Sequence, residues 1–323
     1  MSEIRSDWKL HELEEIYHTP LLSLLSQAAA MHTKYHDRNE IQLCTLISIK
    51  TGGCPEDCKY CAQSARYKTN VKATPMLSYE EVMKSARQAI ASGSSRICLG
   101  AAFREVRNNR PFTEILEMIR GITDLGAEVC CCLGMLTEES AKALKEAGLY
   151  AYNHNLDTSE SYYPKIITTR TYQDRLNTLD IVEDAGISVC CGGILGLGES
   201  VTDRLAMILT LATRKSHPDS VPFNRLSAVA GTPLENAAPV SNWELLRTIA
   251  TARIVLPKTI LRLSAGRLEM SYEEQTLCFL AGANSIFSGE KLLTVANSSI
   301  DRDETLFQLL AVKKRPAFKE QCV

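Results

Sequence analysis

Short segments of strand-forming residues alternate with helical segments along most of this 323-residue chain. We expect eight strands, at residues 41–49, 96–99, 128–133, 150–156, 187–191, 221–226, 260–263 and 283–287. Apolar residues at three- and four-residue spacing predict helices between them, for example at residues 78–91, 137–147, 172–185 and 242–255. Many of these segments end in a glycine typical of a helix C-terminus: Gly93, Gly126, Gly148 and Gly186.

This alternation predicts an α/β fold. Strands that alternate with helices pair in parallel through right-handed crossovers, and eight such units favour a TIM-type (β/α)8 barrel over an open, doubly wound sheet, which remains the alternative. A helical segment at about residues 10–35 precedes the first strand. With no linker or low-complexity segment to divide the chain, we expect a single domain: an N-terminal helical segment (1–38), the barrel (39–290) and a C-terminal tail (291–323).

Charge and hydropathy argue against nucleic acid and membrane as partners. The net charge is −2, the pI is near 6.3, and like charges do not form long runs. The N-terminus is polar, and no apolar stretch reaches the ~18 residues of a membrane span, so we expect a cytoplasmic protein. The twelve cysteines are then more plausible as metal ligands or small buried hydrophobes than as disulfides.

Three cysteines share one short loop directly after the first predicted strand. Cys54, Cys58 and Cys61 are separated by three and two residues, a spacing that suits one face of an iron–sulfur cubane. A closed cluster or zinc site needs four ligands, so one position is left for another molecule. In a barrel this loop lies at the C-terminal mouth, where active sites are found.

Other candidate ligands lie within the predicted strands. Cys98, the triplet 130–132, Cys190, Cys191 and Arg262 come from four different strands, whose inward-facing residues can converge inside a barrel. Because side chains alternate along a strand, Cys130 and Cys132 share a face and Cys131 points the other way. On residues alone, a buried thiol that packs like a small hydrophobe is an equally good interpretation for each cysteine, and a buried ion pair is the favoured interpretation for Arg262.

Several segments together resemble a known family. The three-cysteine loop, with Tyr60 before its last cysteine, is similar to the signature of radical SAM (S-adenosylmethionine) enzymes. More narrowly, the chain resembles the biotin synthase family, from about the first helix to the last strand. The matching segments are residues 48–61, 152–158, 167–172, 192–199, 262–267 and 281–287.

The resemblance implies a radical-generating site. Cys54, Cys58 and Cys61 would hold a 4Fe-4S cluster whose fourth iron binds SAM, and one electron would cleave SAM to methionine and a 5′-deoxyadenosyl radical. Asn155, Asp157 and Arg175, together with Tyr60, would contact SAM. The glycine run 192–198 would allow close approach to the adenosine, although a flexible turn is its simpler interpretation.

The resemblance also implies the reaction. Cys98, Cys130, Cys190 and Arg262 would hold a 2Fe-2S cluster whose sulfur is inserted into dethiobiotin to give biotin. Asn153, Asn155 and Asn224 would bind the substrate, since carboxamides both donate and accept hydrogen bonds. Taken singly, Asn153 and Asn224 are more typical of turns at strand ends than of a binding site. Cys131, Cys132 and Cys191 have no assigned role, while Cys44, Cys278 and Cys322 are interpreted as bystanders.

Partners and alternatives follow from the same resemblance. It implies a flavodoxin- or ferredoxin-type electron donor, iron–sulfur assembly proteins and a homodimer. Two other functions stay open: another radical SAM reaction on the same barrel, such as those of the hydrogenase-maturation and pyrrolysine-biosynthesis enzymes, and a non-catalytic iron–sulfur protein.

Overall fold

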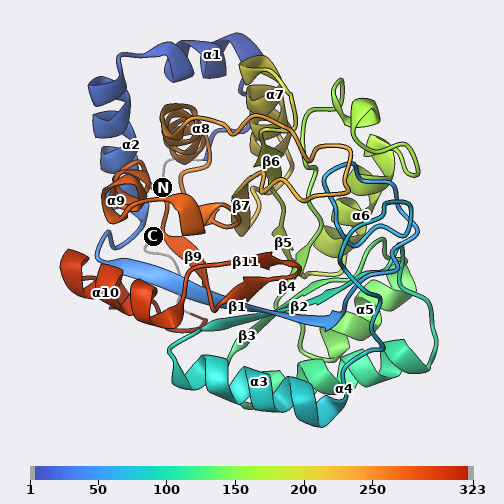
Figure 1. The fold of residues 1–323 in the computed structure, drawn as a ribbon. Helices are drawn as coiled ribbons and strands as arrows, with labels where there is room; N and C mark the ends of the chain where they lie inside the picture. Colours follow the sequence, from blue (N-terminus) through green and yellow to red (C-terminus); the bar gives the residue numbers. More distant parts are fainter. Residues whose placement is uncertain (1–3, 319–323) are drawn as a thin grey trace.

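The computed structural model describes residues 4–318. Its centre is a closed barrel of parallel strands, in which β1 pairs with both β2 and β9 (Figure 1). The predicted TIM-type barrel is therefore confirmed. In order around the barrel, the strands are β1 (Glu40–Lys50), β2 (Arg96–Ala101), β3 (Glu128–Cys132), β4 (Ala151–Asn153), β5 (Ser188–Cys190), β7 (Ser220–Arg225), β8 (Ile260–Leu263) and β9 (Ser285–Ser288).

The glycine run after the fifth predicted strand contains a further short strand that was not predicted. After β5, the chain passes Gly192 and continues as β6 (Gly193–Leu195), which pairs with β7 and bridges to Asp157. A Cβ atom at Gly192 would lie 2.1 Å from the carbonyl oxygen of Pro222, so only glycine allows this close crossing. The fourth strand is also shorter than expected: it ends at Asn153, and Asn155 lies in the loop beyond it.

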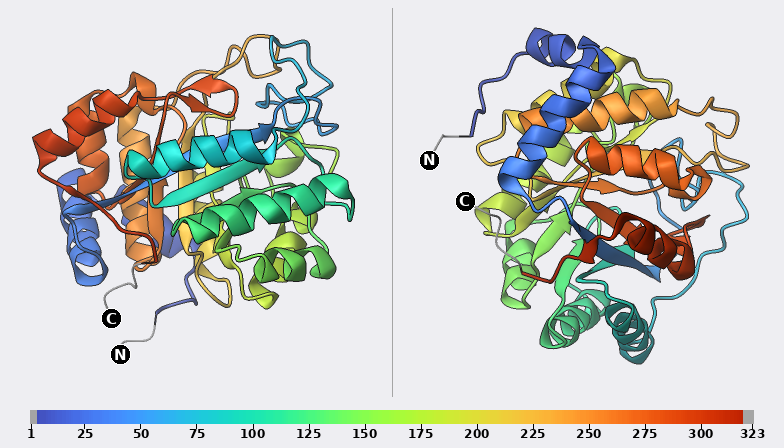
Figure 2. Two further views of the ribbon diagram at one scale, coloured as in Figure 1. Left: turned by 90° about the horizontal axis from the view of Figure 1, so that it is seen from below. Right: turned by 90° about the vertical axis from the view of Figure 1, so that its left-hand side faces the viewer.

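Helices surround the barrel (Figures 1 and 2). Serine or threonine caps the N-termini of six of them with capping boxes, and the glycines predicted to end helices have positive φ angles, +93° at Gly93 for example. The helices that follow strands are α3 (Tyr79–Ala91), α4 (Arg110–Asp124), α5 (Glu138–Glu146), α6 (Tyr172–Asp184), α7 (Val201–Ala212), α8 (Asn242–Val255) and α9 (Tyr272–Leu280).

Both ends of the chain add to the barrel. The predicted N-terminal helical segment forms α1 (Leu10–His18) and α2 (Leu21–Tyr35), divided at Pro20, which pack on α7 and α8 (Figure 2). After β9, a hairpin of β10 (Lys291–Leu292) and β11 (Val295–Ala296) leads to α10 (Ile300–Leu310). The last strand, β12 (Lys313–Lys314), pairs with the start of β1.

A buried ionic group fills the N-terminal end of the barrel. Arg96, which has no exposed surface, donates to Glu128 at 2.7 Å and to Asp219 at 2.9 Å. Gln42 donates to the same Glu128 at 3.1 Å, and Phe318 near the end of the described chain donates its backbone N–H to it at 2.8 Å. We call these residues the barrel floor; the functional residues lie above it.

Candidate active site

The three-cysteine loop begins where β1 ends. Gly52 and Gly53 have φ angles of +74° and +71°, and a Cβ at Gly52 would lie 3.0 Å from the backbone of Ala73, so the turn requires glycine. The loop is then held by its own backbone: the N–H of Cys54 donates to Gln63 at 2.9 Å, and that of Cys61 to Cys58 at 2.9 Å. The sequence thus curls all three thiols around one point.

A second segment fixes the loop from outside. The carboxylate of Asp57 accepts backbone N–H bonds from Thr168 at 2.9 Å and Thr169 at 3.2 Å. Buried Glu56 accepts from Arg104 at 2.7 Å and from the hydroxyl of Thr169. These hydrogen bonds lower the pKa of Asp57 to about 2 against the opposing effect of its partial burial, so it is ionised at neutral pH.

Asp157 joins the loop to the barrel. Its Oδ2 atom accepts from Arg175 at 2.6 Å and from Tyr60 at 2.9 Å, and Arg175 also donates to the hydroxyl of Tyr163 at 3.0 Å. Asp157 has a φ of +68°, an uncommon conformation for a residue other than glycine that is frequent at functional sites. The structure thus brings together Tyr60, Asp157 and Arg175, three of the residues that the sequence analysis assigned to SAM binding.

A cavity of about 300 Å³ opens at the mouth of the barrel beside the loop. Burial raises the pKa of Cys58, and burial together with the neighbouring Cys58 raises that of Cys61 to about 12. The lining includes every residue that the sequence analysis assigned to the upper cluster, SAM or substrate: Cys54, Cys58, Tyr60, Cys61, Asn153, Asn155, Asp157, Arg175 and Asn224.

A second cavity of about 180 Å³ lies deeper in the barrel. It shares Asn153, Asn155, Asn224 and Cys132 with the upper cavity, so the two adjoin. Asn153 donates to Asn155 at 3.0 Å and to the sulfur of Cys190 at 3.3 Å, and Asn224 donates to the carbonyl of Gly193 at 3.1 Å. The three carboxamides therefore lie between the upper and lower sites.

The lower cavity is lined by the thiols of Cys98, Cys130 and Cys190. Cys98 and Cys130 are register partners on β2 and β3. The Cys130 thiol hydrogen-bonds to both of the others, which lowers the pKa of Cys98 and Cys190 and raises that of Cys130 itself. Three buried thiols from three strands thus meet at one level of the lumen.

Arg262 extends into the same cavity from β8. Its guanidinium is 1% exposed and lies 3.8 Å from the sulfur of Cys190. Nε donates to the hydroxyl of Ser285 at 3.0 Å, and Nη2 donates to Oε1 of Gln42 at 3.2 Å. The structure therefore brings together all four residues that the sequence analysis assigned to the lower cluster.

The other cysteines divide by the face of their strand. Cys131 and Cys191 pack in the core between barrel and helices, as alternation predicted for Cys131, although Cys131 also borders the lower cavity; Cys132 lines both cavities. Cys278 is buried on α9, and Cys322 lies outside the described residues. Cys44 differs from its expected place, because it lies in the same buried cluster as Cys98, Cys130 and Cys190.

Two parts of the site were not predicted from the sequence. Arg170 lines the upper cavity, 3.9 Å from the sulfur of Cys58, and the matching segment 167–172 could have revealed it. The β10–β11 hairpin, assigned to a tail, supplies Leu292 to Val295 to the same lining. Its Leu293 reaches Gly100 on β2, where an added Cβ would lie 2.9 Å away. Nothing in the hairpin's short sequence indicates this position.

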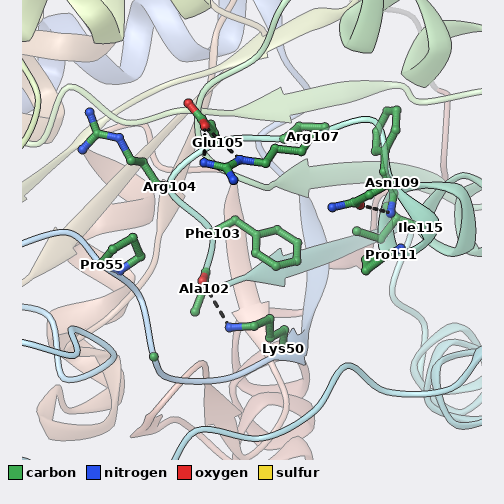
Figure 3. A pocket seen from close by; sticks show the side chains of 13 residues that line it. Lys50, Pro55, Ala102, Phe103, Arg104, Glu105, Arg107, Asn109, Pro111 and Ile115 are labelled. Atoms are coloured by element: carbon green, nitrogen blue, oxygen red, sulfur yellow. Dashed lines mark hydrogen bonds and ion pairs between the residues drawn. The ribbon is translucent and has the colours of Figure 1, made fainter.

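A third hollow, of about 270 Å³, lies on the outer side of the cysteine loop (Figure 3). Gly53 and Pro55, the neighbours of Cys54, form one side of it. The segment after β2 supplies Phe103, Arg104 and Arg107, and Figure 3 shows the side chain of Lys50 pointing to Ala102 at its base. This hollow shares Ala102 and Phe103 with the lining of the upper cavity and borders the loop from the solvent side.

The donor sets suit two iron–sulfur clusters. In residues 4–318 all eleven cysteines are free, and no three Cys, His, Asp or Glu side chains are close enough to hold a single metal ion. A cluster of several irons separates its thiolate ligands more widely than one ion does, and thiolates are the usual ligands of such clusters. The loop offers three thiols beside a cavity, and the lumen offers three thiols and Arg262.

Comparison with known proteins first defines the class. The sequence model of the Radical SAM superfamily matches residues 48–211, and that of the Biotin and Thiamin Synthesis associated domain matches residues 222–313. Methylornithine synthase (TM-score 0.80, covering 95% of this chain and 94% of that one) and the FeFe-hydrogenase maturase HydG from Carboxydothermus hydrogenoformans (0.79, 94% and 75%) share the fold at 19% identity. The chain is thus a radical SAM barrel protein.

Its relatives then define the family. Biotin synthase of Cytophaga hutchinsonii is 57% identical over 99% of this chain and 95% of its own length. Biotin synthase of Chlamydia abortus is 58% identical over 96% and 94%, and the mitochondrial enzyme of Arabidopsis thaliana is 55% identical over 98% and 84%. The chain belongs to the biotin synthase family. In the described part of the chain, no helix is long and apolar enough to cross a membrane.

Proposed function

We propose that this chain catalyses the radical SAM-dependent insertion of sulfur into dethiobiotin to give biotin, and that the residues described above carry out the reaction. The observation that carries the proposal is the lower site: Cys98, Cys130, Cys190 and Arg262 converge inside the barrel, directly below the cavity of the three-cysteine loop. Sulfur insertion requires a sulfur donor, and a second cluster held by this set would supply it. The chain uses a 4Fe-4S cluster, SAM and a 2Fe-2S cluster.

The chain's own residues have separate tasks in this reaction. Cys54, Cys58 and Cys61 would hold the 4Fe-4S cluster, which reduces bound SAM and thereby supplies the carbon radical that removes hydrogen from the substrate. Asp157 orients Tyr60 and Arg175 at the SAM side of the cavity. Asn153, Asn155 and Asn224 would bind the ureido ring between the two clusters, since each can donate and accept.

We propose that the lumen limits the access of water. The β10–β11 hairpin forms one wall of the upper cavity, and the charged floor closes the opposite end. A radical formed between the hairpin and the floor would meet few hydrogen donors other than the substrate. We propose that one domain, with its N-terminal helices (1–38), barrel (39–290) and C-terminal segment (291–323), provides the whole site.

The experiment is a coupled measurement of products and clusters. Protein reconstituted without oxygen should show both 4Fe-4S and 2Fe-2S spectra and should form 5′-deoxyadenosine and biotin together from SAM, dethiobiotin and dithionite. Cys98→Ala and Cys190→Ala should remove only the 2Fe-2S spectrum and the biotin. Cys278→Ala, a buried cysteine far from either donor set, is the matched control. Deoxyadenosine without biotin from a fully loaded wild type would favour another radical SAM reaction, and no SAM cleavage would favour a non-catalytic iron–sulfur protein.

An acidic electron-transfer protein of the flavodoxin or ferredoxin type is the proposed reductant. The hollow of Figure 3 borders Cys54, and the adjoining segment 58–79 contains Lys59, Arg66, Lys68 and Lys72 but no acidic residue. Arg66 donates to the carbonyl of Pro55 at 3.0 Å, which fixes this basic segment against the loop. A basic surface beside the cluster ligands complements an acidic partner and shortens the path of the electron.

The remaining proposals concern the oligomeric state, the loading of the clusters and the location of the protein. Leu22 on α2 and Trp243 on α8 are 83% and 61% exposed, and Leu22 borders a groove between α2 and Leu280. Large apolar side chains grouped on a surface favour a protein contact, and we propose a homodimer. Light scattering of wild type and Leu22→Lys tests this. We also propose that iron–sulfur assembly proteins load both sites and that the protein is cytoplasmic.

A further inference from the structure

The thiol cluster in the lumen has a fourth member. Cys44 on β1 is completely buried and belongs to the same group of side chains as Cys98, Cys130 and Cys190. Its strand lies next to β2, and Leu46, two residues further along the same face, is the register partner of Cys98. Cys44 itself is the register partner of Arg96 in the floor, so its thiol lies on the floor side of this group, outside the lining of the lower cavity, and adds a further thiol beside the three thiols and the arginine of the proposed ligand set.

Cys44 and Arg262 converge on the same two oxygen atoms. The Cys44 thiol lies 3.5 Å from Oε1 of Gln42 and 3.6 Å from the hydroxyl of Ser285. Arg262 donates to the same two atoms, at 3.2 Å and 3.0 Å. Gln42 is itself fixed by its hydrogen bond to Glu128 in the floor. The two side chains thus approach the lower site from the same side.

Their chemistry as iron ligands is very different. Thiolates are the usual ligands of 2Fe-2S clusters, and four of them complete the common set. A guanidine is normally a protonated donor and can bind iron only when neutral. We infer that Cys44 is a reserve ligand that can replace Arg262 on the 2Fe-2S cluster; the inference rests on the lower site of the proposed function.

The replacement of Arg262 by Cys44 as an iron ligand needs no added reagent. The iron–nitrogen bond to Arg262 breaks, an iron–sulfur bond to Cys44 forms, and the thiol proton passes to the guanidine; no electron is transferred. The released guanidinium keeps acceptors, because Oε1 of Gln42 and the hydroxyl of Ser285 are already within its reach. Ser285 and Gln42 are register partners on β9 and β1, so these two acceptors stay together during the replacement.

Four proteins test the inference: wild type, Cys44→Ala, Arg262→Ala and the double variant. Each is reconstituted, and iron, sulfide and visible circular dichroism are measured. Cys44→Ala should match wild type, and Arg262→Ala should keep its 2Fe-2S cluster with the spectrum of four thiolates. The double variant should bind the cluster about tenfold more weakly or worse, since even loss of an outer partner costs that much. Equal cluster content and spectra in Arg262→Ala and the double variant would overturn the inference.

Controls separate this result from misfolding. Arg262→Ala with Cys44→Ser changes one atom of the reserve ligand, so its charge-transfer bands should shift if Cys44 binds iron; bands identical to those of Arg262→Ala would again contradict the inference. Cys191→Ala in the same background removes a buried thiol of the outer core that lines neither cavity and should leave the cluster unchanged. The 4Fe-4S content reports folding. A wild type without a 2Fe-2S cluster would instead refute the lower site itself.

Discussion

At the scale of single residues, Asp157 connects the cluster loop to the substrate cavity. One carboxylate oxygen holds both Tyr60 and Arg175, and all three are buried or half-buried. Charged hydrogen bonds of this kind are stronger than neutral ones, and their geometry is fixed before any ligand enters. Tyr60, Asp157 and Arg175, although distant from one another in the sequence, therefore act as one unit.

Asp157→Asn tests this unit. Asparagine tolerates the positive φ of position 157 but removes the charge that Arg175 requires, so SAM affinity should fall roughly 10- to 100-fold. The 4Fe-4S content should not change, because the cysteine loop keeps its own hydrogen bonds. Anaerobic equilibrium dialysis with SAM is the measurement, and Asp184→Asn, an exposed residue at the end of α6, is the control. Unchanged SAM affinity would exclude this role.

His32 gives a prediction about pH. Burial and the charge of Arg253 lower its pKa from 6.5 to about 2, and in the described structure neither ring nitrogen has a hydrogen-bond partner. The folded state holds a neutral ring, whereas the unfolded chain binds a proton below pH 6.5. This contribution to stability is complete above pH 6.5 and decreases as the pH falls from there toward the folded pKa.

His32→Leu should therefore flatten the stability profile. Its free energy of unfolding should exceed that of wild type by about 1 kcal/mol at pH 7 and by about 2 kcal/mol more at pH 5. Urea unfolding at pH 7.5, 6 and 5 measures the difference, with His11→Gln, an exposed histidine, as control. A difference that does not grow with acidity would show that His32 is already protonated in the folded protein.

At the scale of elements, the barrel was predictable because each strand and helix has a local pattern. Ser78 and Thr171 cap helices through residues three positions away, and Gly93 ends one within the next turn. The division of β5 from β6 was not predictable, because it depends on Gly192 crossing Pro222, which is distant in sequence.

The residues of the two sites also differ in whether local sequence could predict them. The cysteine loop is a local motif, and the strand positions of Cys98, Cys130 and Cys190 follow from alternation. The position of Cys44 in their cluster depends on the pairing of β1 with β2 and β9, and no spacing within β1 indicates it. The covering hairpin was missed for the same reason, since its two short strands have no periodicity of their own.

The β10–β11 hairpin gives the prediction at this scale. Leu293→Ala removes the contact with Gly100 and opens the cavity to water, so 5′-deoxyadenosine formed per biotin should rise while SAM binding stays the same. Product ratios after a single turnover are the measurement. Lys291→Ala changes an exposed residue of the same hairpin and should leave the ratio as in wild type. An unchanged ratio in Leu293→Ala would mean that the hairpin does not seal the site.

At the scale of the whole molecule, the floor links distant parts of the chain. Glu128 receives bonds from β1, β2 and Phe318, and Asp219 adds a second carboxylate to Arg96 and accepts from Tyr150 at 3.2 Å. Glu128→Leu leaves Arg96 with one carboxylate fewer and should cost about 3–5 kcal/mol of stability. Arg96→Met combined with Glu128→Leu should recover part of the loss. Urea unfolding checks both; a single variant as stable as wild type would contradict the prediction.

The electron donor is tested at the same scale. Lys68→Glu with Lys72→Glu reverses two exposed charges near the cluster loop and should slow flavodoxin-supported biotin formation several-fold at low salt, with little effect on the dithionite-supported rate. Lys142→Glu on α5, which reverses a charge elsewhere on the surface, is the control. Equal loss with both reductants would indicate damage to the site, and no loss with flavodoxin would place its docking surface elsewhere.

The seam between β1 and β9 has a consequence for synthesis. Ser285 follows its hydrogen-bond partner Gln42 by 243 residues, so the ribosome delivers the closing strand long after the cysteines of β1 to β5. Until then the seam cannot form and the barrel cannot close. The complete ligand set of the lower site, which includes Arg262 on β8, therefore exists only after most of the chain has been made.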